Sequence, residues 1–204
     1  DNKNNYKRKG LVLGYVQSGK TASMAGIISM YADAGCSIFI ILSGVNNNLQ
    51  QQTEKRFRKD LGVDDRKGWY YLPENINNSA QKIEGVSGIL IGVFKKNARV
   101  LDNLIKYYKS VNNPSYLLDH QILIIDDECD QAAPNGKDYK KEERTAINRK
   151  ITDLLELLPR ASYIGYTATP FANVLNEPPA PKSLYPENFI HALPEPPAYF
   201  GDRK

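Results

Sequence analysis

Residues 14–21 read Gly14-Tyr15-Val16-Gln17-Ser18-Gly19-Lys20-Thr21, and this stretch decides the fold. It fits the pattern of a glycine, four variable residues and then Gly-Lys-Ser/Thr, in which backbone N–H groups and a helix N-terminus surround phosphates. A short apolar run, residues 11–13, precedes the loop, and a helical pattern over residues 20–34 follows it. A loop between a strand and a helix is the context that a phosphate-binding loop requires, so the sequence predicts a nucleotide site here.

Each residue type in the loop predicts a role. Lys20 is expected to reach the β- and γ-phosphates of ATP and to act in catalysis, and the Thr21 hydroxyl is expected to bind Mg²⁺. The residues expected to surround the nucleotide are Gly14, Gln17, Ser18, Gly19, Lys20 and Thr21.

Outward from this loop, short apolar runs alternate with longer segments of helical period. The runs cover residues 38–42, 89–93, 122–125 and 162–166, and the helical segments cover 47–60, 97–110 and 141–158. Runs that are apolar without alternation are typical of strands buried on both faces. We therefore expect a three-layer α/β fold, a RecA-like P-loop NTPase lobe with a mainly parallel central sheet. Residues 62–88 have weak periodicity and predict no clear element.

The character of the chain changes near residue 175. Most of its 12 prolines follow that point. Such composition is typical of an extended segment. We expect a lobe over residues 1–175 and a proline-rich extension or linker over 176–204, which leads toward a second lobe.

The apolar run 122–125 leads directly into Asp126-Asp127-Glu128-Cys129-Asp130. So many carboxylates in one short stretch repel one another unless a cation is present, and Mg²⁺ is the expected cation. Asp127 is expected to hold the metal and Glu128 to orient and deprotonate the attacking water. Spacing alone leaves open whether Asp126 or Asp127 faces the metal.

Composition restricts the class of protein and little else. The formal net charge of +4 is compatible with nucleic acid but too small to indicate it. No stretch approaches the roughly 20 apolar residues that span a bilayer, so no membrane is expected. Cys36 and Cys129 form no metal-binding pair and lie in or beside apolar strand patterns, which favours a reducing, cytoplasmic location.

The motifs resemble those of known proteins. Asp127-Glu128-Cys129-Asp130 resembles the DExD/H box of superfamily-two helicases, and Thr167-Ala168-Thr169-Pro170 resembles their third motif. Together with residues 14–21, 126–132, 163–173, 184–190 and 199–201, they resemble the Z-one domain family. Its members are described as endonucleases with a helicase-like ATPase core, often encoded near restriction or defence genes.

The resemblance implies an ATPase that works on DNA, within a larger restriction or phage-defence protein and with possible partner proteins of that system. It implies that Thr167 and Thr169 couple the nucleotide site to a second RecA-like lobe. That lobe supplies arginine fingers, so the fragment alone is expected to hydrolyse ATP poorly. In such lobes the tips of later strands contact the DNA backbone, and the matching positions are Ser43, Asn46, Lys95, Lys96 and Asn97. An Asn helix cap and a solvated basic turn explain these residues equally well.

Other functions fit less well. The Glu-x-Lys of many restriction nucleases does not occur, and neither does the Asn-Lys-x-Asp with which GTPases read guanine. A regulatory or scaffold module, in which ATP orders an assembly without motor activity, remains as the alternative.

Overall fold

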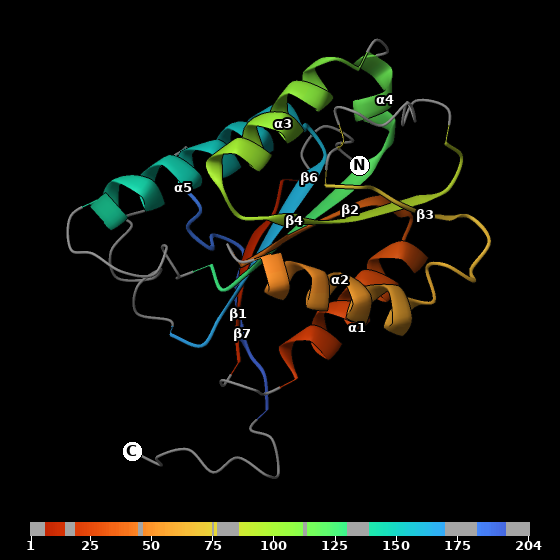
Figure 1. Ribbon diagram of the computed structural model, residues 1–204, viewed down its shortest axis with the longest axis horizontal. Coiled ribbons are helices and arrows are strands. Elements are labelled where there is room, and N and C mark those ends of the chain that lie inside the picture. The colour runs from red at the N-terminus through yellow and green to blue at the C-terminus, as the bar shows by residue number, and fades with distance from the viewer. Residues whose placement is uncertain are drawn as a thin grey trace.

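The computed structural model describes residues 7–14, 19–44, 47–74, 76, 86–111, 114–129, 139–169 and 183–194. They form a three-layer α/β structure with helices on both faces of one sheet, as the sequence predicts (Figure 1). The elements are β1 (Lys9–Leu13), α1 (Lys20–Asp33), β2 (Cys36–Ser43), α2 (Asn47–Leu61), β3 (Trp69–Tyr71), β4 (Ile89–Lys95), α3 (Ala98–Lys109), α4 (Pro114–Asp119), β5 (Gln121–Asp127), α5 (Tyr139–Leu157), β6 (Ala161–Thr167) and β7 (Phe189–Ala192).

The sheet has seven strands in the order β3-β4-β2-β5-β6-β1-β7, and every neighbouring pair is parallel. The central strands β2 and β5 are buried over nearly their whole length. Their apolar runs do not alternate because helices cover both faces of the sheet. Since the strands are parallel, the loops that follow β1, β2, β4, β5 and β6 all leave from the same edge.

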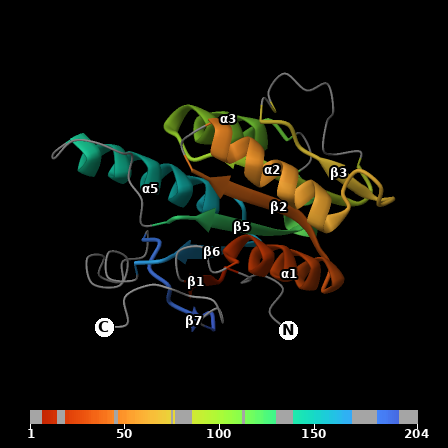
Figure 2. The ribbon, with the colours of Figure 1, turned by 60° about the horizontal axis from the view of Figure 1, so that its bottom comes forward.

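Each face of the sheet has its own core. Helices α1 and α2 cover one face (Figures 1 and 2). On this face, Met24 and Ile28 pack with Phe39 and Ile125. Helices α3 and α5 cover the other face, where side chains such as Leu104 pack against alternate residues of the same strands. Successive side chains of a strand point to opposite faces, so the strand position decides which core a residue joins.

Two elements lie where the sequence predicted none. The short strand β3 falls within residues 62–88, and its Trp69 stacks on Phe39 with the ring centroids 6.4 Å apart. Helix α4 has six residues and precedes β5. Both are too short to show a period in the sequence.

The expected linker over residues 176–204 also differs from the structure in its described part. Strand β7 adds to the sheet beside β1, and Leu193 N donates to Leu13 O at 2.7 Å (Figure 2). The backbone N–H of Asn188 donates to Lys9 O at 3.0 Å, and the side-chain Oδ1 of Asn188 accepts a bond from Lys9 N at 2.7 Å. All four β7 residues are exposed. This edge strand therefore lacks the buried apolar run from which a strand can be predicted in a sequence.

Within the described residues, both cysteines are free thiols, and no helix combines the length and apolar character that a bilayer span requires.

Candidate functional site

The phosphate-loop residues that the structure describes lie where β1 ends and α1 begins. Gly14 N donates to Thr167 O at 3.0 Å, which fixes the end of β1 to the end of β6. Gly19 has a φ of 77°, a left-handed conformation that glycine adopts without strain, and α1 begins at the next residue. Lys20 and Thr21 therefore lie in the first turn of α1, at its N-terminus. Gln17 and Ser18 lie outside the described residues.

Asp126 points to the face of the sheet covered by α3 and α5. It is 2% exposed, and its two carboxylate oxygens accept bonds from Lys96 Nζ at 2.7 Å and from the Tyr163 hydroxyl at 2.8 Å. A buried carboxylate held by a cation and a hydroxyl is satisfied by the protein itself. This carboxylate is therefore part of the core.

Asp127 points to the opposite face, where α1 lies. Burial and, after it, the neighbouring Glu128 carboxylate raise the pKa of its carboxyl to about 6, with Lys20 and Lys96 opposing the shift. Its Oδ1 atom is buried without a hydrogen-bond partner. Of the two neighbouring aspartates, Asp126 thus has both oxygens bonded within the protein, whereas Asp127 has a buried oxygen without a protein partner.

Ser43 lies next to Asp127 across the sheet. Leu42 and Asp126 are paired between β2 and β5, and Ser43 and Asp127 each follow their paired residue. Strand alternation places both on the α1 face. The Ser43 hydroxyl is also buried without a partner. Two unpaired buried oxygens at the same strand ends are unusual, because buried polar groups are normally satisfied.

Glu128 begins the turn after β5 in a strained backbone conformation. Its φ is 54°, the one positive value among non-glycine residues in the described part of the chain. Such residues cost about 1 to 3 kcal/mol and persist where neighbours hold them in place. Here Lys96 Nζ donates to Glu128 O at 2.7 Å, and Cys129 N donates to Tyr166 O at 2.9 Å. The Glu128 carboxylate lies over the end of β2, since a Cβ built on Gly44 would be 3.8 Å from its Oε2.

The end of β6 adjoins both the phosphate loop and the acidic turn. Thr167 is fully buried, and its Oγ1 accepts a bond from Thr169 N at 3.0 Å. Its carbonyl holds Gly14, as described above. Tyr166 is also fully buried, with its hydroxyl 3.2 Å from Ser23 Oγ on α1, so it packs in the core. Asp130, Pro170 and Phe171 lie outside the described residues.

The candidate DNA contacts are not all at the surface. Ser43 is 1% exposed and Lys96 is 4% exposed, so neither side chain is available to a phosphate in this conformation. Because the Lys96 side chain is buried, a solvated basic turn does not explain this residue. Asn97 caps α3, its Oδ1 accepting from Val100 N at 2.9 Å, and Lys95 Nζ is bonded to Asn47 Oδ1 at 2.7 Å. Asn46 lies outside the described residues.

Sequence reasoning missed the contact between Lys96 and the acidic turn. The sequence offers one signal for it, since Lys96 directly follows the buried strand β4 and the acids directly follow β5. That signal becomes specific only once β2 is known to bond to both strands. Tyr163 was missed as a partner of Asp126 for the same reason.

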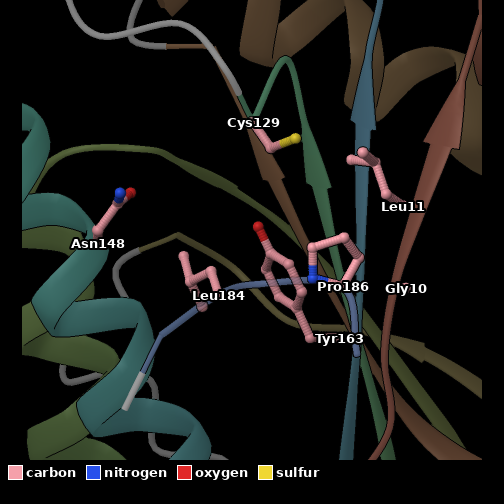
Figure 3. A pocket seen from close by; sticks show the side chains of 7 residues that line it. All are labelled: Gly10, Leu11, Cys129, Asn148, Tyr163, Leu184 and Pro186. Carbon is pink, nitrogen blue, oxygen red and sulfur yellow. The ribbon is translucent and has the colours of Figure 1, made fainter. Parts of the chain in front are cut away.

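A small cavity of about 20 Å³ lies on the α5 side, lined by Gly10, Leu11, Cys129, Asn148, Tyr163, Leu184 and Pro186. Figure 3 shows the Tyr163 ring and the Leu184 and Pro186 side chains around it. That volume admits about one water molecule, so this cavity is no substrate site. Among the described residues no three His, Cys, Asp or Glu side chains cluster to hold a metal by themselves. A Mg²⁺ ion held by one carboxylate together with nucleotide phosphates needs no such cluster.

The chain is similar in sequence to a family of ATPases and in fold to a helicase domain. A sequence profile described as SWI2/SNF2 ATPase matches residues 1–189. The crystal structure of the Pyrococcus furiosus Hef helicase domain superposes with a TM-score of 0.50 at 16% identity, covering 92% of this chain and 35% of that one. A DnaB-like replicative helicase, described with its primase interactions, and the Aeropyrum pernix ORC2 protein superpose less well, with TM-scores of 0.43 and 0.33. Each of these two is 12% identical, with 88% of this chain covered and 45% and 48% of theirs.

No curated protein sequence matches the chain at a significant level. The chain spans about a third of the length of the Hef helicase domain. The superfamily-two helicase-like core expected from the sequence is confirmed, whereas the finer resemblance to the Z-one domain family stays a prediction.

Proposed function

Because the chain belongs to the SWI2/SNF2 ATPase family, and is thus a helicase-like ATP-binding lobe of superfamily two, we propose that the complete protein is a DNA-dependent ATPase that translocates on DNA. The observation that carries the nucleotide chemistry is the buried Oδ1 atom of Asp127, which has no hydrogen-bond partner and lies on the face where Lys20 begins α1. Burying such an oxygen without a partner destabilises the folded protein, and a bound cation would remove that cost.

The described residues fit ATP with Mg²⁺. The N-terminus of α1 and the left-handed Gly19 form the frame of an anion site. Two oxygens without protein partners, Ser43 Oγ and Asp127 Oδ1, lie at the adjoining strand ends, suited to a hydrated cation. When bound, Mg²⁺ would neutralise phosphate charge during transfer.

The chain's own residues then take distinct roles. Lys20 would bind the β- and γ-phosphates, with Gly14, Gln17, Ser18 and Gly19 around them. Thr21 and Asp127 would hold the metal, and Ser43 would orient a water in its hydration shell. Glu128 would orient the attacking water and accept its proton, since its carboxylate stands at the end of β2 beside the same edge. These assignments extend the sequence predictions without altering them, apart from Ser43.

Thr167 is the residue proposed to couple the nucleotide site to the second lobe and DNA. Thr167 touches the phosphate loop through Gly14 and the following loop through Thr169, which suits it to transmit the nucleotide state toward a second RecA-like lobe. Lys95 and Asn46 remain candidates for DNA backbone contact, since Lys95 keeps 20% of its side chain exposed. A restriction or defence setting rests on the Z-one resemblance alone, and we propose no nuclease reaction for the described residues.

The scaffold alternative differs in one testable respect, which is turnover. A fluorescent ATP analogue is titrated with Mg²⁺ into wild type, Lys20→Ala and Glu128→Gln. We expect binding by wild type and by Glu128→Gln, and its loss in Lys20→Ala. In the complete protein, DNA should stimulate ATP hydrolysis by wild type, and Glu128→Gln should abolish it. Binding with no turnover at any DNA concentration would favour the scaffold, and no binding by folded wild type would refute the nucleotide site.

A further inference from the structure

The side chain of Lys96 is a buried cation that contacts three consecutive residues of the acidic turn. Its Nζ lies 2.7 Å from Asp126 Oδ1, 2.8 Å from Asp127 O and 2.7 Å from Glu128 O. An ammonium group has three donor hydrogens, so all of them are used. Only one of the three bonds neutralises a charge; the other two hold backbone carbonyls.

The two carbonyl bonds fall where the backbone is strained. Glu128 has a left-handed φ, its carboxylate lies near Gly44 at the end of β2, and its carbonyl accepts a bond from Lys96 Nζ. A non-glycine residue keeps such a conformation only where its neighbours hold it, and two hydrogen bonds do so here. Cys129 N bonded to Tyr166 O supplies one, and Lys96 supplies the other.

Lys96 is itself fixed. Its own N–H donates to Ser43 O at 2.9 Å, and the next residue, Asn97, caps α3. Lys96 therefore links the end of β2, through its backbone N–H, to the acidic turn after β5, through its ammonium. A lysine that served only to neutralise Asp126 would need none of these carbonyl contacts.

We propose that Lys96 is a positioning residue of the ATPase site, which holds the Asp127–Glu128 peptide so that the Glu128 carboxylate reaches the attacking water. The inference rests on the proposed hydrolysis and adds a residue that neither the phosphate-loop nor the acidic motif contains. A misplacement of about 1 Å can lower a rate by about 100-fold, so loss of the clamp should act on turnover.

The test separates positioning from charge balance. Lys96→Met alone would leave Asp126 charged and buried, so it is combined with Asp126→Asn, which keeps an oxygen for Tyr163. In the complete protein with DNA, the double variant K96M/D126N should fold and bind the fluorescent ATP analogue within about twofold of wild type, while kcat falls about ten- to 100-fold. K150M/D102N, which removes the ion pair of Lys150 with Asp102 away from this edge, is the matched control and should keep wild-type kcat.

A second readout does not depend on turnover. In nucleotide-free protein, amide hydrogen exchange of a peptide spanning residues 126–129 should accelerate about tenfold in K96M/D126N, while exchange in α1 stays unchanged. Faster exchange throughout the chain, or a folded double variant with wild-type kcat, would overturn the inference.

If K96M/D126N is too unstable for the kcat measurement, Lys96→Arg tests the same inference. It keeps the charge that Asp126 requires, but a planar guanidinium cannot place three donors on the same three oxygens, so kcat should fall here too. Wild-type kcat in Lys96→Arg would count against the inference. Lys20→Ala is measured first: if wild type and Lys20→Ala bind ATP equally, the proposed function itself is wrong, whatever the Lys96 variants do.

Discussion

Asp126 and Asp127 are consecutive residues whose carboxylates lie on opposite faces of the sheet, one satisfied by the protein and the other not. Asp126 is bonded to Lys96 and Tyr163, whereas Asp127 keeps a buried oxygen without a partner. The alternation of a strand produces this separation, because adjacent side chains point to opposite sides. The same substitution at the two positions should therefore have opposite effects on stability.

Asp126→Asn should destabilise the protein. It removes the charge beside the Lys96 ammonium, which is 4% exposed, and breaking a buried pair costs about 3 to 5 kcal/mol. Urea denaturation at pH 7.5 would measure the loss. Adding Lys96→Met should recover part of it, since the two residues are coupled. Wild-type stability in Asp126→Asn would mean that the pair contributes nothing.

Asp127→Asn should stabilise the metal-free protein at neutral pH. The pKa of this carboxyl is raised to about 6 from the model-peptide value of 3.8, so the folded state binds more protons than the unfolded state between those values. The free energy of unfolding of the wild type therefore falls as the pH rises from about 4 to about 6. Above about pH 6, the ionised Asp127 carboxylate destabilises the folded protein by about 1 to 3 kcal/mol.

The asparagine variant lacks this penalty, so its advantage over wild type should be present at pH 7.5 and vanish near pH 4. Denaturation curves in EDTA at the two pH values would show it. The same variant should lose Mg²⁺-dependent binding of the ATP analogue, a trade of function for stability. An equal advantage at both pH values would show that titration of Asp127 is not its cause.

Ser43→Ala should leave the fold intact but weaken the use of Mg²⁺. Its hydroxyl has no partner in the protein, so its removal should leave metal-free stability unchanged or raise it by about 1 kcal/mol. If the hydroxyl orients water around the metal, the Mg²⁺ concentration needed for half-maximal binding of the ATP analogue should rise about tenfold. Ser23→Ala is the matched control, because that serine, on α1, has Tyr166 as its partner. It should lose a little stability and keep the wild-type Mg²⁺ requirement.

Much of this fold could be predicted from the sequence, because it depends on local signals. The strand, loop and helix around residues 9–33 follow from an apolar run, a glycine-rich loop and a helical period. The central strands were recognisable because burial on both faces leaves an unbroken apolar run. Strand β7 lacked that signal, since its exposed residues include His191 and its surroundings are rich in proline.

The site was predictable in its motifs but not in its supporting contacts. That Lys96 is buried depends on β4 and β5 both lying beside β2, an order that residue spacing does not reveal. A lysine after a strand is usually solvated, so its sequence favoured the surface. Ser43 is only a candidate DNA contact from its sequence for a similar reason, since a small polar residue at a strand end suits a phosphate as well as it suits a buried site.

Gly165→Ala should disturb the turn after β5 by crowding Cys129. A Cβ at residue 165 would lie 2.8 Å from Cys129 Sγ and 3.3 Å from its Cβ, closer than carbon and sulfur pack. Overpacking of this kind costs about 1 to 3 kcal/mol, and thermal melting would measure it. Adding Cys129→Ala removes the sulfur and should recover most of the loss, in a double-mutant cycle with a clear coupling energy. Gly26→Ala, in α1 with nothing within 4 Å of the added carbon, is the control and should stabilise slightly. Independent, additive effects of the Gly165 and Cys129 substitutions would mean that the turn does not rest on this contact.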